Sequence, residues 1–398
     1  MAQYHFPPIE FLKDSTEASK FQRLEYVQRL KDKLDEMFAS FHVNARVVDY
    51  HYNKFAILMK VKLGPDASVK TIRNLRPEIG LYMAGPVEFL DADEDNNLIT
   101  IAIKNIQRPI VPLKEVIQSA AFQEAASPVT VAAGIDLLGK AFVFDIAKMP
   151  NLLVAGVTGS GKSVFLHDII LSILYKAHPD EVKLLLFDMK NIEFPLLNGI
   201  PHMLQDTITD TDTGLEVLRW LQNEKSDRLY RMARIKAANI DQYNKMSSSK
   251  MYRIVVIVDE FMEYIRRNDR NDRYESERID LFNAALEDLV KDSAATGIHL
   301  ILATQRPTDD VITPQIKKML PCRVAFYVVD KRESKIVLNR YGAERLAGHG
   351  DMIFTRSDSD TGVHAQAAFV SYDEVDKVID FARRESGLFG TEPILKDN

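Results

Sequence analysis

The chain has 398 residues, enough for two or three domains, and its 46% hydrophobic and 27% charged content is typical of a soluble globular protein. No apolar run reaches the ~18 residues of a membrane-spanning helix, and the N-terminus lacks the pattern of a secretion signal, so we expect a cytoplasmic protein without direct membrane insertion. One cysteine, Cys322, excludes an internal disulfide and is expected in a buried strand, and a net charge of −6 means that any nucleic-acid surface must be local.

After an N-terminal extension over residues 1–20, residues 21–125 have the pattern of a small α/β domain. Apolar residues recur three and four positions apart and predict an amphipathic helix, with Leu24, Val27, Leu30, Leu34, Phe38 and Phe41 on its inward stripe. Strand-like runs follow at Ala45–Tyr50, Phe55–Leu63 and Leu98–Ile103, and a helical stretch lies at Ser68–Met83. Nothing in this region has the spacing of metal ligands or of a catalytic nucleophile.

Residues 126–398 change to alternating strands and helices, which predicts a parallel-rich central sheet. The expected strands are Leu152–Ala155, Lys183–Phe187, Arg253–Val258, Ile298–Thr304 and Arg323–Val329. The first four end in polar residues, and open α/β sheets bind ligands at the carboxyl edge of their strands. We therefore expect Ser163, Asp188, Asp259, Glu260 and Gln305 to lie together along one edge.

The stretch NLLVAGVTGSGKSV, from Asn151 to Val164, joins the first of these strands to a helical pattern through a glycine-rich turn that ends in Lys162 and Ser163. The glycine spacing and the strand and helix on either side satisfy the requirements of a P-loop. Such a turn directs its backbone N–H groups at phosphate oxygens, the lysine reaches the β and γ phosphates, and the serine hydroxyl ligates Mg²⁺. The predicted ATP-binding residues are Gly156, Val157, Thr158, Gly159, Ser160, Gly161, Lys162, Ser163 and Val164.

The stretch RIVVIVDE, from Arg253 to Glu260, is an apolar strand followed by two adjacent acids. Asp259 fits the role of holding Mg²⁺ together with Ser163, and Glu260 can polarise the water that attacks the γ-phosphate. Gln305 follows the next strand and can sense the γ-phosphate or orient that water, although a strand cap explains its position almost as well.

Four segments in this order carry a resemblance: GVTGSGKSV, IVVIVDEF, GIHLILATQRPTDDVIT and CRVAFYVVDKRESKIVLNRYGAERLAGHGDMIF. They resemble the motor domain of the FtsK/SpoIIIE family of DNA translocases, and RVVDY, SVKTIRNLRPEIGLYM and SPVTVAAGID extend the similarity upstream. The resemblance covers about Leu24 to Arg383. It implies a RecA-like P-loop ATPase domain preceded by the small α domain of the family.

The resemblance also implies a motor that hydrolyses ATP with Mg²⁺, assembles as a hexameric ring and pumps double-stranded DNA through its central channel. Arg306, Lys317 and Lys331 match family positions that contact the DNA backbone. Basic side chains that line a channel can hold duplex DNA in an acidic protein, because the affinity comes from released counterions.

The sequence departs from the family pattern in three places. Ala294 stands where the family usually has an arginine that reaches the neighbouring subunit's ATP, so we expect Arg323 or Lys291 to substitute. Residues 266–280 form an unusually long run of mixed charges, and after the helical stretch 375–384 no winged-helix domain is expected.

Because we expect neither a membrane anchor nor a winged-helix domain, the chain resembles the reduced relatives carried by plasmids, phages and integrative elements, and a membrane or mobile-element protein is a possible partner. Two other functions stay open: an ATPase that energises conjugative or protein export, and an assembly module that binds ATP without hydrolysing it.

Overall fold

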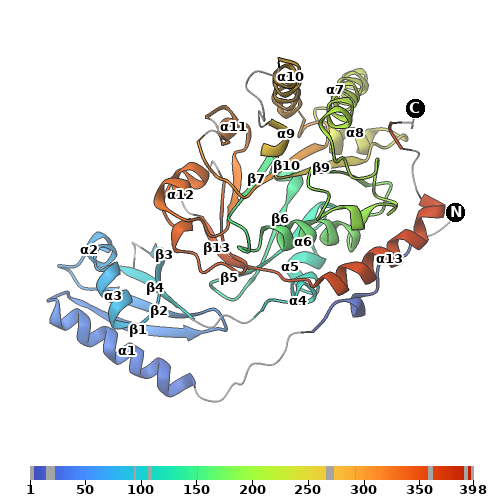
Figure 1. Cartoon of the computed structure of the whole chain (residues 1–398). Coiled ribbons are helices and arrows are strands. Elements are labelled where there is room, and N and C mark those ends of the chain that lie inside the picture. The colour runs from blue at the N-terminus through green and yellow to red at the C-terminus, as the bar shows by residue number, and fades with distance from the viewer. Residues whose placement is uncertain are drawn as a thin grey trace. The chain divides into compact units, whose positions relative to one another are not determined.

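The computed structural model describes residues 4–14, 23–93, 96–105, 110–149, 151–265, 273–291, 293–309, 311–312, 314–356, 362–389 and 393–395. The chain divides into two compact units, each built from two or more segments (Figure 1). The smaller unit comprises residues 15–111 and 135–140, and the larger comprises residues 1–14, 112–134 and 141–398. This division differs from the predicted boundary at residue 125, because residues 112–125 pack with the larger unit and residues 135–140 with the smaller one. In the described part of the chain, no helix has both the length and the apolarity needed to cross a bilayer.

The smaller unit is an antiparallel sheet with helices packed on it. Its elements are α1 (Arg23–Ser40), β1 (Ala45–Tyr52), β2 (Ala56–Leu63), α2 (Val69–Asn74), α3 (Arg76–Tyr82), β3 (Val87–Asp93) and β4 (Leu98–Lys104). The strand order is β1-β2-β4-β3, and each neighbouring pair is antiparallel. β3 was not predicted, whereas the other three strands lie where the sequence pattern placed them.

The apolar stripe of α1 forms much of this unit's core, as its periodicity predicts. Val27, Leu30, Leu34 and Phe38 are buried among the sheet's apolar side chains. Leu24, which the predicted stripe included, has its side chain outside the described part of the structure. The prediction was wrong for Phe41, which is 41% exposed because the helix ends at Ser40.

The larger unit is organised around a nine-stranded mixed sheet in the order β6-β5-β13-β12-β11-β7-β10-β9-β8. Its strands are β5 (Thr130–Asp136), β6 (Ala141–Asp145), β7 (Asn151–Ala155), β8 (Val182–Asp188), β9 (Arg253–Asp259), β10 (Ile298–Thr304), β11 (Cys322–Ala325), β12 (Asp351–Thr355) and β13 (Val363–Ala367). The run from β11 to β8 is parallel throughout, while β12 and β13 join in antiparallel orientation.

Helices cover both faces of the parallel run (Figure 1). The helices of this unit are α4 (Leu113–Ile117), α5 (Ala120–Gln123), α6 (Lys162–Leu174), α7 (Thr211–Arg234), α8 (Ile240–Met246), α9 (Met262–Ile265), α10 (Arg273–Val290), α11 (Pro314–Met319), α12 (Lys331–Leu338) and α13 (Tyr372–Phe389). Short 3₁₀ turns are η1 (Ile9–Phe11), η2 (Ile146–Lys148), η3 (Pro195–Leu197) and η4 (Ala343–Arg345). α7 and α10 pack together on one face, and α6 contacts α13 on the other.

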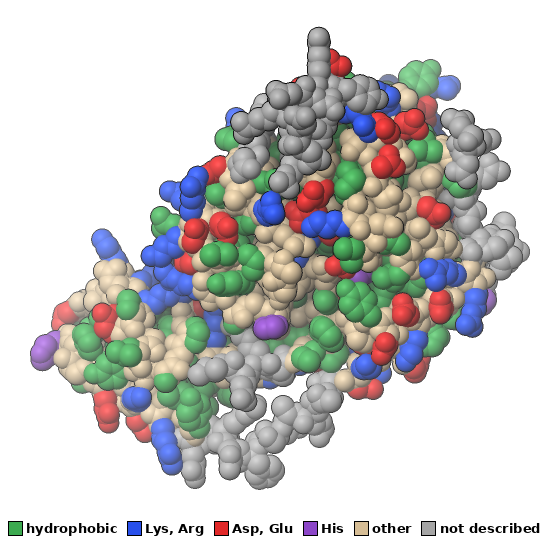
Figure 2. Space-filling model, in the orientation of Figure 1, with side chains coloured by type: hydrophobic (Ala, Val, Ile, Leu, Met, Phe, Trp, Pro, Cys, Tyr) green, Lys and Arg blue, Asp and Glu red, His purple; other side chains and the backbone are tan. Residues whose placement is uncertain are grey.

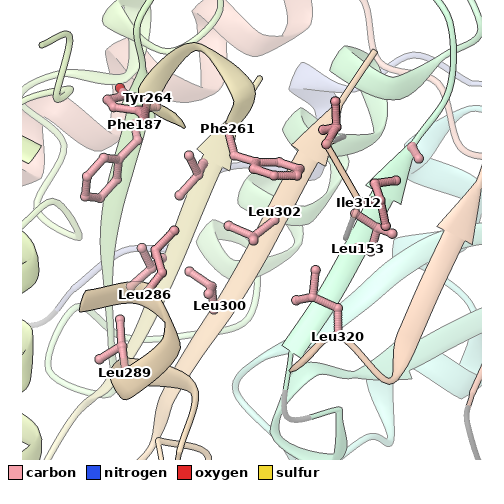
Figure 3. Close-up of a cluster of buried hydrophobic side chains, with 14 of the residues drawn as sticks. Leu153, Phe187, Phe261, Tyr264, Leu286, Leu289, Leu300, Leu302, Ile312 and Leu320 are labelled. Carbon is pink, nitrogen blue, oxygen red and sulfur yellow. The ribbon is translucent and has the colours of Figure 1, made fainter. Parts of the chain in front are cut away.

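The core of the larger unit lies between the sheet and the helices α7 and α10. Figure 3 shows Leu300 and Leu302 of β10 beside Leu286 and Leu289 of α10, with Leu153 of β7 in the same layer. β7, β8, β9 and β10 are buried along their whole length, which matches their uninterrupted apolar sequences. Burial on both faces holds the carboxyl ends of these strands in fixed register.

The predicted strands of the larger unit are confirmed, with one correction. The prediction of a strand from Arg323 to Val329 was too long, because β11 ends at Ala325. Its partner β7 ends at Ala155, the last paired residue, and turns away there. Cys322 is buried at the start of β11, as expected. Of the mixed-charge run 266–280, residues 266–272 lie outside the described part of the chain, and the rest begins α10.

Candidate functional site

The turn between β7 and α6 has the backbone of a phosphate cradle. Gly159 and Gly161 have φ angles of +76° and +114°, and Gly161 is the N-cap of α6. Only glycine adopts such angles at little cost. Gly156 is required for a different reason, since a Cβ atom there would lie 2.6 Å from Cβ of Phe326. The spacing of glycines therefore follows from two backbone angles and one close contact.

The predicted ATP-binding residues all lie in this turn or in the first turn of α6. Thr158 and Gly159 are exposed, and Val157, Gly161, Ser163 and Val164 are half-buried. Gly156, Ser160 and Lys162 are buried. The exposed tip and the positive end of α6 leave a place where an anion can meet backbone N–H groups.

Lys162 is nearly inaccessible, with 3% of its surface exposed, and its ammonium group pairs with Oδ1 of Asp259. Asp259 is the last residue of β9, and β10 lies between β9 and β7 in the sheet. Burying a lysine is costly unless a carboxylate compensates its charge. The pair thus connects the P-loop to the predicted Mg²⁺ ligand across the intervening strand.

Glu260 follows directly and has a φ angle of +47°, an uncommon conformation for glutamate. Its carboxylate accepts a hydrogen bond of 2.9 Å from Oγ1 of Thr304 and one of 3.1 Å from the backbone N–H of Gln305. The ammonium of Lys190 lies 3.8 Å from Oε2 of Glu260. Strained backbone angles persist where the surrounding contacts enforce them, as these three groups do for Glu260.

Gln305 connects this carboxylate to the P-loop. Its backbone N–H faces Glu260, and its side-chain Oε1 accepts a hydrogen bond of 2.7 Å from the Thr158 hydroxyl. The structure therefore brings together Lys162, Asp259, Glu260 and Gln305, the four residues proposed from the sequence as catalytic.

Asp188 lies on the same edge of the sheet, at the end of β8, but its carboxylate is bonded to backbone groups of the turn that follows it. It accepts hydrogen bonds from the backbone N–H groups of Lys190, Ile192, Glu193 and Phe194. Such a carboxylate shapes the loop after the strand. Its effect on the site is indirect, since the turn carries Lys190 toward Glu260.

The three proposed DNA-contacting residues lie on loops and helices that follow the central strands. Arg306 and Lys331 are exposed, and Lys317 is half-buried in α11. Arg332, next to Lys331, forms an ion pair of 2.9 Å with Asp309, so the loop after β10 lies beside the first turn of α12. Figure 2 shows Lys and Arg side chains gathered around α12 on this face, with acidic side chains among them.

Of the two cations proposed to substitute for the arginine missing at Ala294, Arg323 is committed to its own unit. It is 7% exposed, and its guanidinium donates to the backbone carbonyls of Leu320, Val337 and Lys317 at 3.0–3.1 Å. A side chain held in this way is bonded within its own unit, which argues against that hypothesis. Lys291 is exposed and remains a candidate.

Sequence reasoning missed the loop that closes over the P-loop. The backbone N–H of Gly350 donates to the carbonyl of Ser160 at 2.8 Å, and Asp351 forms a buried contact of 2.6 Å with Nε2 of His364. The glycines around His349 in the segment GHGD were the only available signal, and a turn is their ordinary meaning.

A glycine cradle, a buried lysine paired with an acid two strands away, and an intervening strand followed by a glutamine define the site of a P-loop NTPase with a RecA-like sheet. Sequence comparisons identify the family. The model of the FtsK/SpoIIIE family matches residues 112–309, and that of the FtsK alpha domain matches residues 6–104. The chain belongs to the FtsK/SpoIIIE family.

Curated relatives are similar over nearly the whole chain. The DNA translocase FtsK of Caldanaerobacter subterraneus is 35% identical over 385 residues, which are 96% of this chain and 52% of the relative. The DNA translocase SftA of Bacillus subtilis is 35% identical over 402 residues, which are 99% of this chain and 41% of the relative. The chain thus spans about half the length of these relatives, or less.

Solved structures show the same fold at lower identity. The conjugation coupling protein TcpA, in a monomer form with ATPgS, superposes with a TM-score of 0.63 at 22% identity, covering 88% of this chain and 99% of TcpA. ATPases 2 and 3 of EssC from Geobacillus thermodenitrificans give a TM-score of 0.56 at 19% identity, covering 68% of this chain and 52% of that chain. These likenesses establish the P-loop ATPase architecture.

Proposed function

We propose that this chain binds ATP with Mg²⁺ and hydrolyses it to translocate double-stranded DNA. The observation that carries the proposal is the convergence at one sheet edge of Lys162, Asp259, Glu260 and Gln305, directly followed by the exposed Arg306. Membership of a family whose named relatives are DNA translocases supports the choice of substrate.

The residues present fit a magnesium nucleotide. The P-loop offers glycines in place of side chains, and nothing lies within 4 Å of a Cβ built on Gly159, so phosphate oxygens can approach the backbone. Lys162 would bind the β and γ phosphates, and the hydroxyl of Ser163 and the carboxylate of Asp259 would hold Mg²⁺. Bound Mg²⁺ offsets negative charge on the phosphate oxygens.

Glu260 would take the proton from the attacking water, since its carboxylate is held by donors from Thr304 and Gln305 at the end of β10. Gln305 would orient that water or respond to the γ-phosphate through its bond to Thr158. Both roles place the reacting water between β9 and β10.

Arg306, Lys317 and Lys331 would contact phosphates of the DNA backbone, which explains how an acidic chain of net charge −6 could hold DNA. Such contacts position the duplex without reading its sequence. We further propose a hexameric ring in a cytoplasmic setting, in which a cation such as Lys291 reaches the nucleotide of the adjacent subunit.

The test is an ATPase assay with and without long linear duplex DNA. We expect DNA to activate hydrolysis strongly in the unmodified protein. Lys162→Ala should lose nucleotide binding. Glu260→Gln should retain ATP binding, but its turnover should be slower by about 100-fold or more. Activation by a protein substrate and not by DNA would favour an export motor. A lack of hydrolysis under both conditions would favour a passive assembly module.

The DNA surface is tested by changing Arg306, Lys317 and Lys331 together to alanine. We expect weaker DNA binding, a shallower dependence of affinity on salt, and unchanged basal ATP binding, because each lost phosphate contact removes about one released counterion. Unchanged DNA affinity would refute the assignment.

A matched control removes the same amount of charge elsewhere in the larger unit. Lys236, Lys245 and Lys250 are exposed and lie on the segment before β9, at the opposite end of that strand from Glu260. The triple alanine variant at these positions should leave DNA affinity close to that of the unmodified protein. Equal losses in both triple variants would mean that net charge alone determines binding.

A further inference from the structure

The loop between η4 and β12 borders the P-loop on the side away from the acidic pair. Gly350 donates its N–H to the Ser160 carbonyl at 2.8 Å. The approach is so close that a Cβ atom on Gly161 would lie 2.8 Å from the nitrogen of Gly350. This loop is therefore a second wall of the phosphate cradle, in contact with the residues just before α6.

The loop has an unusual backbone that many contacts hold in place. Gly348, His349 and Gly350 have consecutive φ angles of +74°, +49° and +89°. Gln366 donates from Nε2 to the carbonyl of His349 at 2.7 Å, and the N–H of Ala367 donates to the carbonyl of Gly350 at 2.7 Å. A non-glycine residue with positive φ is uncommon and indicates a site where surrounding structure enforces the conformation.

Asp351 fixes the other end of the loop. One carboxylate oxygen contacts Nε2 of His364 at 2.6 Å, and the other accepts the N–H of Ala347 at 2.9 Å. The backbone around His349 is thus anchored at both ends, while the His349 side chain is exposed. The result is an exposed histidine carried on an anchored backbone, next to the residue that bonds to the cradle.

The strand order indicates which part of a nucleotide lies on this side. From β7, the acidic strand β9 lies beyond β10 in one direction, and β12 lies beyond β11 in the other. Lys162, Asp259 and Glu260 assign the terminal phosphate to the β9 direction. A nucleoside triphosphate is extended, so its base must leave the cradle in the opposite direction, toward β12 and its preceding loop.

We propose that His349 packs against the base of the bound nucleotide and contributes to affinity for nucleotides over base-free phosphates. The inference rests on the proposed nucleotide site and adds a residue that the P-loop and acidic motifs do not include. An imidazole offers an aromatic face to the base and a ring nitrogen to a polar group on its edge. The anchored backbone limits the entropy lost when the ring makes this contact.

The test compares the affinity of ADP with that of pyrophosphate, both with Mg²⁺, by calorimetry on the full chain. Neither ligand is consumed by ATP hydrolysis, so binding is measured apart from turnover. His349→Asn keeps a residue that tolerates positive φ and removes the ring. We expect ADP affinity to fall about threefold to tenfold, as for other lost aromatic contacts, with pyrophosphate affinity unchanged.

Two further variants sharpen the comparison. His349→Tyr retains an aromatic face and should restore most of the ADP affinity. His42→Asn is the matched control, because His42 is also exposed and has a φ of +55°, but lies in the smaller unit between α1 and β1. It should leave both affinities unchanged.

Equal ADP affinity in His349→Asn and the unmodified protein would overturn the proposal. Equal losses for ADP and pyrophosphate would also overturn it, since they would show that the loop only supports the P-loop. Failure of the proposed function has a different signature: an unmodified chain that binds ADP as expected but shows no DNA-activated hydrolysis leaves the base contact intact and removes the translocase.

Discussion

Gly161 and Gly159 provide a matched pair of substitutions in the P-loop. Both have positive φ angles, +114° and +76°, so alanine at either position costs about 1–2 kcal/mol of backbone strain. The two glycines differ in the free space around the position of an added Cβ atom. A Cβ on Gly161 would lie 2.8 Å and 2.9 Å from backbone atoms of Gly350, whereas a Cβ on Gly159 would have nothing within 4 Å.

The backbone of Gly350 is tied to Ser160 and Ala367 and cannot yield easily. Overpacking of this kind costs about 1–3 kcal/mol, so Gly161→Ala should destabilise the larger unit by about 2–5 kcal/mol and Gly159→Ala by about 1–2 kcal/mol. The displaced loop should also weaken ADP binding more in Gly161→Ala than in Gly159→Ala.

Urea unfolding followed by tryptophan fluorescence measures the difference in the relevant unit. Trp220 is the only tryptophan of the chain and packs, partly buried, against the core of the larger unit. Its signal therefore reports on that unit and not on the smaller one. Equal unfolding midpoints for the two alanine variants would refute the reasoning that Gly350 confines Gly161.

Three further predictions concern buried and bridging groups. Burial lowers the pKa of His202 and of His299 to about 3 in the folded chain. In the unfolded chain these histidines have a pKa of about 6.5, so below that pH they bind protons that they do not bind when folded. The contribution of these histidines to the free energy of unfolding should be fully present above that pH and fall toward pH 3 by about 1.4 kcal/mol per pH unit for each histidine. Urea unfolding followed by fluorescence at pH 7 and pH 5 would measure this loss. A free energy of unfolding that does not depend on pH over this range would contradict the prediction. Arg323→Met leaves two buried carbonyls and one half-buried carbonyl without their donor and should lower the free energy of unfolding by about 2–4 kcal/mol. A variant of full stability that lacked ATPase activity would instead support a role between subunits. Gln305→Ala should reduce DNA-stimulated hydrolysis about tenfold with unchanged ADP affinity, as expected for a water-positioning group, whereas a loss of stability alone would indicate a strand cap.

The part of the site that sequence could predict lies in short contiguous motifs. The residues from Gly156 to Val164 and the pair Asp259 and Glu260 each combine a strand with a change in composition, and parallel pairing then brings the strand ends together. The edge location of Gln305 followed from the same rule. Motif spacing and strand pattern were enough for these residues because their positions depend on local structure and on one sheet.

The rest depends on contacts between distant segments that no local pattern encodes. β12 and β13 are short, and their antiparallel pairing places Gly350 on the P-loop only once the whole sheet has formed. Lys190 reaches Glu260 because Asp188 folds the intervening turn back on itself. Arg323 appeared in sequence to be a free cation, and only its burial shows that its hydrogen bonds are used internally.

The position of β10 between β7 and β9 explains how the nucleotide site and the basic loop can act together. The carbonyl of Thr304 accepts the N–H of Gly156 at 3.2 Å, while its hydroxyl donates to Glu260 at 2.9 Å and accepts the N–H of Arg306 at 3.0 Å. One residue thus bonds to the cradle, to the acidic pair and to the loop that carries the exposed arginine. A shift of the Glu260 carboxylate would change the hydrogen bond that the Thr304 hydroxyl donates, and the same hydroxyl oxygen accepts the N–H of Arg306. Communication between these groups therefore requires no long pathway, because all of them bond to Thr304, the last residue of β10.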